Sequence, residues 1–187
     1  MKRLSLYLFL ILFTLQTPSL ADDIRDFQIE GISLGDSALN FFSEEEIKNG
    51  TGPYYPKSKK FIMVATQKLS EDYDMIQFHT KDRDKKYIIE SIEGVIWYEN
   101  NIKDCYKKMD EVVNDLTKIF DEVQPSKKRR LKSSYGKGTD ISLKFKSGDV
   151  INVACNDYKK KYEGFTDGLK IAILSKEFKN WIEREAF

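Results

Sequence analysis

Apolar residues recur at every third or fourth position between residues 101 and 123. This spacing places apolar side chains along one side of a helix, so it predicts a long amphipathic helix. The apolar series comprises Ile102, Cys105, Tyr106, Met109, Val112, Val113, Leu116, Ile119 and Phe120. Residues 177–187 carry a shorter version, with Phe178, Trp181 and Ile182 on one side, and predict a closing helix.

Runs of alternating apolar and polar residues predict six strands. The first lies within residues 59–68, and residues 73–82 and 85–99 form a hairpin across a charged turn. Residues 138–157 give the strongest hairpin signal, because a Ser-Gly-Asp turn separates two alternating runs. The sixth strand lies within residues 167–176.

Together with a short helix after Ser43, the elements follow the order α-βββ-α-βββ-α. Strands joined by short turns favour antiparallel pairing. The sequence therefore predicts an α+β, two-layer fold with an antiparallel sheet of about six strands and helices packed on one face. Residues 22–187 are expected to form a single domain, with residues 124–137 as a polar basic loop. The repeated helix-plus-three-strand order suggests an internal duplication.

The N-terminus has the pattern of a secretory signal peptide. Lys2 and Arg3 precede an apolar run over residues 4–15, and small residues at Ser19 and Ala21 fit a cleavage site before Asp22. The run is too short for a membrane span of about 20 residues, so we expect no stable membrane anchor after cleavage. Lysine greatly outnumbers arginine, which is typical of AT-rich bacterial genomes. The predicted location is therefore periplasmic or secreted.

Cleavage would change the charge balance only slightly. It removes two of 31 basic residues and leaves 29 against 30 acidic ones, a net charge of −1. This balance predicts neither nucleic acid nor an acidic surface as a partner.

The chain has two cysteines, and both lie on predicted apolar faces. Cys105 belongs to the amphipathic helix, and Cys155 alternates with Ile151 and Val153 on one face of a strand. In an oxidising compartment this predicts a disulfide, which would contribute about 4 kcal/mol by closing a loop of about 50 residues. Two buried free thiols are the alternative. Two cysteines and one histidine do not supply a zinc tetrad, so we expect no metal site.

The stretch ISLGDSALNFF (residues 32–42) resembles the Gly-Asp-Ser-Leu block of a family of small secreted esterases. The resemblance implies Ser37 as a nucleophile in a parallel-sheet fold, together with an Asp-x-x-His block near the C-terminus and a Gly-x-Asn segment. This chain has neither, and its single histidine is His79. We therefore favour Ser37 as a helix cap, and keep a serine hydrolase as the alternative function. His79 falls on the polar side of its strand and is expected to be solvated.

Two segments are candidate binding surfaces. Lys127, Lys128, Arg129 and Arg130 open a basic run that continues through Lys132 to Lys137 around Tyr135. Outside the cytoplasm such a run fits anionic lipid or lipopolysaccharide, although a solvated loop is the favoured interpretation. Tyr54 and Tyr55 lie between prolines, either as a preorganised contact loop or as a cover for the sheet edge.

A second resemblance concerns the segment FQIEGISLGDSALNFFSEEEI (residues 27–47). It is similar to the N-terminal signature of small exported bacterial proteins without an assigned function, and the resemblance brings no catalytic residue or cofactor with it. The element order is also similar to tandem helix-and-sheet exported modules, such as β-lactamase inhibitors and outer-membrane assembly accessories, which bind proteins with a sheet face. The predicted function is an exported soluble binding protein of the bacterial envelope, with no catalysis or cofactor and with an envelope protein or small ligand as partner.

Overall fold

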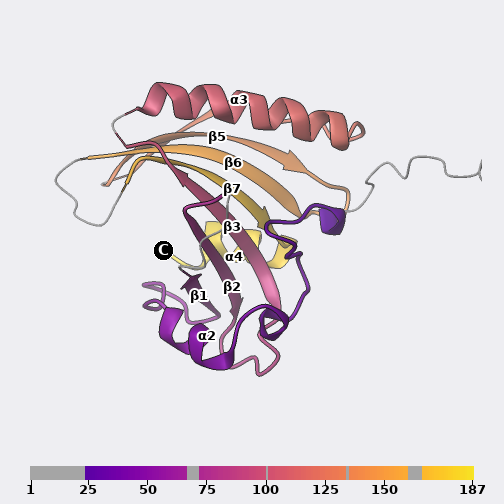
Figure 1. The fold of residues 1–187 in the computed structure, drawn as a ribbon, viewed down its shortest axis with the longest axis vertical. Coiled ribbons are helices and arrows are strands. Elements are labelled where there is room, and N and C mark those ends of the chain that lie inside the picture. The colour runs from indigo at the N-terminus through magenta and orange to yellow at the C-terminus, as the bar shows by residue number, and fades with distance from the viewer. Residues whose placement is uncertain (1–23, 67–71, 100, 134, 160–165) are drawn as a thin grey trace, which may run out of the picture.

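Seven antiparallel strands form one sheet in the order β1-β2-β3-β7-β6-β5-β4 (Figure 1). The computed structural model describes residues 24–66, 72–99, 101–133, 135–159 and 166–187. The strands are β1 (Phe61–Thr66), β2 (Met75–Lys81), β3 (Ile89–Trp97), β4 (Arg129–Lys132), β5 (Gly136–Lys144), β6 (Val150–Tyr158) and β7 (Gly168–Leu174). The helices are α2 (Glu44–Gly50), α3 (Ile102–Ile119) and α4 (Lys176–Arg184), with 3-10 turns η1 (Ile24–Asp26) and η2 (Ala38–Asn40). The predicted α+β class with an antiparallel sheet is confirmed.

The sheet consists of two meanders that meet in its middle. Strands β1, β2 and β3 are consecutive neighbours, as are β5, β6 and β7, and the third strand of each set pairs with the other. Helix α2 precedes the first meander and α3 the second, so the helix-plus-three-strand order recurs in the fold. Strand β4 is an addition at the edge of the second meander.

Strand β4 corrects the predicted count of six strands and the predicted loop over residues 124–137. It pairs with β5 from Arg129↔Asp140 to Lys132↔Lys137. The pairing begins earlier, because Pro125 bridges to Leu143 and the Ser126 N–H donates to the Ser142 carbonyl at 2.8 Å. A solvated edge strand needs no apolar face, so it lacks the alternation on which the prediction relied.

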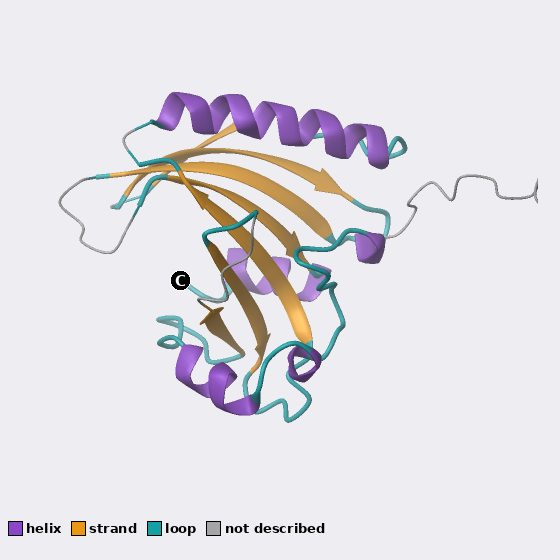
Figure 2. Ribbon diagram, in the orientation of Figure 1, coloured by secondary structure: helices purple, strands orange, loops and turns teal. Residues whose placement is uncertain are grey.

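Helices lie on both faces of the sheet, which corrects the prediction of a single helical layer (Figure 2). Phe61 and Val64 are three residues apart in β1 and therefore point to opposite faces. Val64 belongs to the main core, which includes Cys105 and Met109 of α3. Phe61 packs instead in a second cluster with Phe178 of α4, at a ring-centroid distance of 5.3 Å. The apolar side of α4 thus has its own partner surface, which the two-layer expectation ignored.

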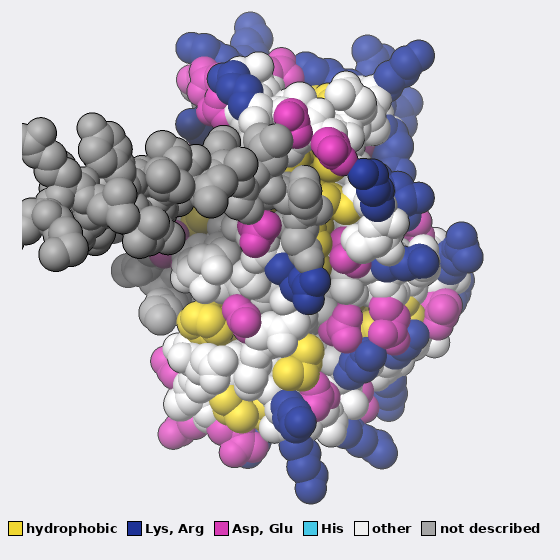
Figure 3. Space-filling view, turned by 90° about the vertical axis from the view of Figure 1, so that its right-hand side faces the viewer, with side chains coloured by type: hydrophobic (Ala, Val, Ile, Leu, Met, Phe, Trp, Pro, Cys, Tyr) yellow, Lys and Arg dark blue, Asp and Glu magenta, His cyan; other side chains and the backbone are white. Residues whose placement is uncertain are grey.

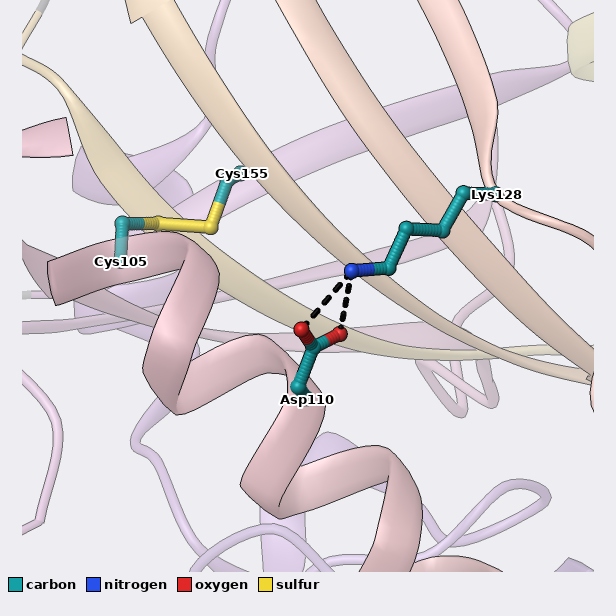
Figure 4. The surroundings of a disulfide bond; sticks show 4 residues. All are labelled: Cys105, Asp110, Lys128 and Cys155. Atoms are coloured by element: carbon teal, nitrogen blue, oxygen red, sulfur yellow. Dashed lines mark hydrogen bonds and ion pairs between the residues drawn. A yellow bond between two sulfur atoms is a disulfide. The ribbon is translucent and has the colours of Figure 1, made fainter. Parts of the chain in front are cut away.

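The main core lies between the sheet and α3, and the disulfide crosses it. Cys105 of α3 and Cys155 of β6 are bonded, with their Cα atoms 6.0 Å apart, and both are fully buried (Figure 4). The predicted disulfide is confirmed. Within the described ranges, no helix is long and apolar enough to cross a membrane. The predicted cleavage site at Ala21 and Asp22 lies outside the described residues.

Candidate binding surface

Ser37 forms a backbone cap. Its side-chain oxygen accepts the Leu39 N–H at 3.3 Å, and its hydroxyl donates to the Lys86 carbonyl at 2.6 Å. This confirms the predicted cap at the start of η2. The Ser37 hydroxyl therefore donates one local hydrogen bond and accepts another. Nothing in the described geometry brings an imidazole to this hydroxyl, since the single histidine is hydrogen-bonded to a tyrosine.

His79 is buried, which corrects the prediction of a solvated histidine. Its side of β2 faces α4, where its ring lies 4.4 Å from the Phe178 ring, and only 2% of the residue is exposed. The Tyr55 hydroxyl and Nε2 of His79 are 2.7 Å apart, whereas Nδ1 has no hydrogen-bond partner. Burial lowers the pKa of His79 to about 4, the Glu93 carboxylate opposes that shift, and the Lys170 ammonium adds to it.

An ion pair between the partly exposed Lys170 and the buried Glu93 lies on the same face. Nζ of Lys170 is 2.6 Å from the Glu93 carboxylate, which also accepts a hydrogen bond from the Gln77 amide. Burial alone would raise the pKa of Glu93, but the Lys170 ammonium, His79 and the Gln77 hydrogen bond together hold that pKa below its usual value. The same attraction raises the pKa of Lys170 against the effect of burial. Both groups stay charged and paired, so neither offers a free acid or base.

The two predicted binding segments lie at opposite edges of the sheet. Tyr54 and Tyr55 lie beside β1 and β2, whereas the basic run lies in β4 and the residues next to it. The Tyr55 ring contacts Trp181 at a centroid distance of 4.9 Å and is half-buried, so it serves as a cover for α4. Tyr54 remains 47% exposed, with its hydroxyl donating to Asp82 at 3.1 Å. The segments therefore do not form one surface.

Two of the basic side chains are held by carboxylates of this chain. Nζ of Lys128 contacts both oxygens of Asp110 on α3, at 2.7 and 2.8 Å (Figure 4). The Arg129 guanidinium binds Asp140 of β5 through two hydrogen bonds of 2.7 and 3.0 Å, and this bidentate pairing raises the pKa of Arg129. The Asp140 side chain is 4% exposed, so this pair fixes β4 to β5.

The other basic side chains between residues 127 and 132 are uncompensated. Lys127, Arg130 and Lys132 are exposed, and in the described part of the chain their side chains have no hydrogen-bond or ion-pair partner. We call the five cations Lys127, Lys128, Arg129, Arg130 and Lys132 the basic edge. Like charges this close repel one another. Two internal carboxylates neutralise two of the five cations, so the basic edge keeps three uncompensated positive charges.

A hollow of about 450 Å³ adjoins the end of the basic edge at the β4–β5 turn. Lys132, Lys137 and Lys159 line it together with Tyr158. Lys137 is 3.2 Å from Asp157 across the β5–β6 pair. The positive surface thus continues past β4 and includes part of the predicted run from Lys127 to Lys137.

Elsewhere the surface carries mixed charge. On the face drawn in Figure 3, basic side chains recur along the right-hand margin among acidic ones, and apolar side chains form only small separate patches. The described residues of that face form no broad apolar contact area (Figure 3). Among the described residues, no group of three or more His, Cys, Asp or Glu side chains is placed to hold a metal ion.

Sequence reasoning identified the basic run but not the carboxylates that divide it. Asp110 is 18 residues from Lys128 in the sequence, and Asp140 is 11 residues from Arg129. One signal for Asp140 was present, since it is an acid within the otherwise alternating strand signal of residues 138–157. Comparison of the chain with protein-family models, curated proteins and solved structures gave no match.

Proposed function

We propose that this protein is an exported, non-catalytic binding protein of the bacterial envelope, and that the basic edge is its binding surface. The observation that carries the proposal is the set of three exposed cations, Lys127, Arg130 and Lys132, that have no acidic partner on the described chain. The uncompensated positive charge of these side chains favours anionic ligands. The disulfide between Cys105 and Cys155 and the signal-peptide pattern support a periplasmic or secreted location.

The charge is local rather than global. With the signal peptide removed, the chain has a net charge of −1, so non-specific attraction of the whole molecule to anions is weak. Binding to the basic edge should therefore depend on particular side chains and should weaken as salt screens them. Binding through the overall charge would respond equally to any lost lysine.

Polyglutamate provides a simple anionic probe. We expect the oxidised protein to bind fluorescently labelled polyglutamate in an anisotropy titration, with a Kd that rises steeply with ionic strength. The triple variant K127E/R130E/K132E should bind at least about tenfold more weakly, because it reverses all three uncompensated charges.

The matched control reverses three exposed lysines in the segments around β1 and β2, away from the basic edge, in the variant K57E/K85E/K86E. It changes the net charge by the same amount and should bind nearly as well as the unmodified protein. Equal loss in the two variants, or no binding by the unmodified protein, would contradict the assignment of this surface.

A further inference from the structure

The outer edge of β4 is open in the described structure. The sheet ends there, and none of the described segments pairs with β4 on the side away from β5. The opposite edge differs, because Thr51 bridges to Val64 and the Gly52 N–H donates to the Met63 carbonyl at 2.9 Å beside β1. An uncovered edge offers a row of backbone donors and acceptors to another extended chain.

The register identifies which backbone groups face outward. The Ser133 N–H donates to the Gly136 carbonyl at 2.9 Å, just beyond the Lys132↔Lys137 pair. Inward and outward directions alternate along an antiparallel strand. The N–H and C=O groups of Arg130 and Lys132 therefore point away from β5. Both residues also carry uncompensated cationic side chains.

The two sides of the edge differ chemically. Arg130 and Lys132 point to the same side of the sheet as Cys155, because Arg130 pairs with Thr139 and Thr139 with Cys155. Leu131 is half-buried and points to the other side with Arg129, whose charge Asp140 already neutralises. A strand laid along this edge would meet uncompensated cations on one face and an apolar side chain on the other.

From this juxtaposition we infer that β4 accepts an extended segment of an acidic partner protein as an eighth strand of the sheet. The segment alternates acidic residues, facing Arg130 and Lys132, with apolar residues beside Leu131. Main-chain hydrogen bonds supply affinity and the alternating side chains supply specificity. The same cations would oppose pairing with the β4 of a second copy, since like charges would then lie directly opposite one another. This inference rests on the proposed function, for which it names the partner class.

The test separates the backbone from the charge at a single residue. R130T removes the cation and keeps the N–H, whereas R130P removes both. Proline is tolerated on an edge strand where its missing N–H faces outward. The probe is a labelled, end-capped octapeptide that alternates glutamate and valine. We expect R130T to weaken its binding several-fold, and R130P to weaken it at least about tenfold beyond R130T.

A second measurement needs no folded proline variant. The same octapeptide, N-methylated at alternate residues so that the amides on one edge are blocked, should bind the unmodified protein at least about tenfold more weakly. In amide hydrogen exchange, the peptide should also slow the exchange of the Arg130 and Lys132 N–H groups. The control is polyglutamate, which should bind R130T and R130P equally if it contacts side-chain charge alone.

These measurements test strand addition separately from anion binding by the basic edge. If R130T and R130P bind the octapeptide equally and N-methylation has no effect, strand addition is overturned while an anion-binding basic edge stands. If neither polyglutamate nor the octapeptide binds, the proposed function itself fails. Self-association that protects the same two amides would overturn the inference by making a second copy the occupant.

Discussion

The imidazole of His79 is held neutral by its surroundings. Packing against Phe178 removes the ring from water. The Tyr55 hydroxyl is hydrogen-bonded to Nε2, whereas Nδ1 has no hydrogen-bond partner. Burial disfavours the charged form and lowers the pKa to about 4. At neutral pH the ring therefore acts as a polar packing element under α4, and protonation would place an unpaired charge inside the second cluster.

Stability should fall as the pH drops from about 6.5 to about 4. In this window the unfolded chain protonates His79, with an ordinary pKa of 6.5, and the folded chain does not. Acid therefore favours the unfolded state, and the difference between a pKa of 6.5 and one of about 4 corresponds to about 3 kcal/mol. Urea denaturation across this range measures it, and the single histidine allows a direct NMR titration.

The variant H79Q is the control, because it keeps a polar side chain that does not titrate. Its free energy of unfolding should change less with pH than that of the unmodified protein, by about the same 3 kcal/mol. The stability that Glu93 contributes is also lost as the pH falls, but only below about pH 4.5, the usual pKa of a glutamate. Parallel curves for the two proteins between pH 6.5 and 4.5, or an imidazole that titrates near 6.5, would contradict the burial of His79.

At the scale of elements, the disulfide joins α3 to the middle of the second meander. Cys105 and Cys155 are separated by 50 residues, and the loop they close contains α3, β4 and β5. The covalent link therefore restricts the unfolded chain over the whole segment that carries the basic edge. Lys128 and Asp110 also lie within this loop, and their ion pair connects the residue just before β4 to α3.

Removal of the disulfide in the variant C105A/C155A should lower the free energy of unfolding by about 4 kcal/mol, through the entropy regained by the unfolded loop. Chemical denaturation of the oxidised protein and the variant measures this difference. The reduced unmodified protein should resemble the variant rather than the oxidised form. Equal stability of the variant and the oxidised protein would show that the bond adds nothing to the packing around it.

The elements differ in how clearly the sequence specifies them. Helix α3 and the β5–β6 hairpin were predicted because the spacing of their apolar residues matches the side of each element that is buried. Strand β4 was missed, since Arg130 and its neighbours remain in water and need no periodicity. The face that covers His79 was misassigned because the second cluster comes from α4 and Phe61, which are distant in sequence. Asp110 and Asp140 could be paired with their cations only once the register was known.

At the scale of the whole molecule, the two meanders share one sheet and one core. Seven residue pairs join β3 to β7, from Ser91↔Leu174 to Trp97↔Gly168. The main core combines Phe78 and Ile92 of the first meander with side chains of α3 and β6 from the second. Neither meander can therefore unfold without exposing apolar surface of the other, so the recurrent halves should behave as one cooperative unit.

Two tryptophans report on distant parts of this unit. Trp97 ends β3 and is 46% exposed, whereas Trp181 of α4 is buried in the second cluster and donates its indole N–H to Ser58 at 2.8 Å. In W97F the fluorescence comes from Trp181, and in W181F it comes from Trp97. Within each variant we expect urea unfolding followed by fluorescence to coincide with unfolding followed by far-UV circular dichroism.

The comparison is made within a variant because W181F is itself destabilising. It removes buried volume and the bond to Ser58, so its midpoint should be lower than that of W97F. A Trp181 transition that precedes the loss of circular dichroism would mean that α4 detaches from the sheet first. In that case the second cluster, which contains Phe61 and contacts His79, would be a separate unit packed on the sheet. Coincident transitions in both variants would instead show that the second cluster and the main core unfold together, because both pack against strands of the same sheet.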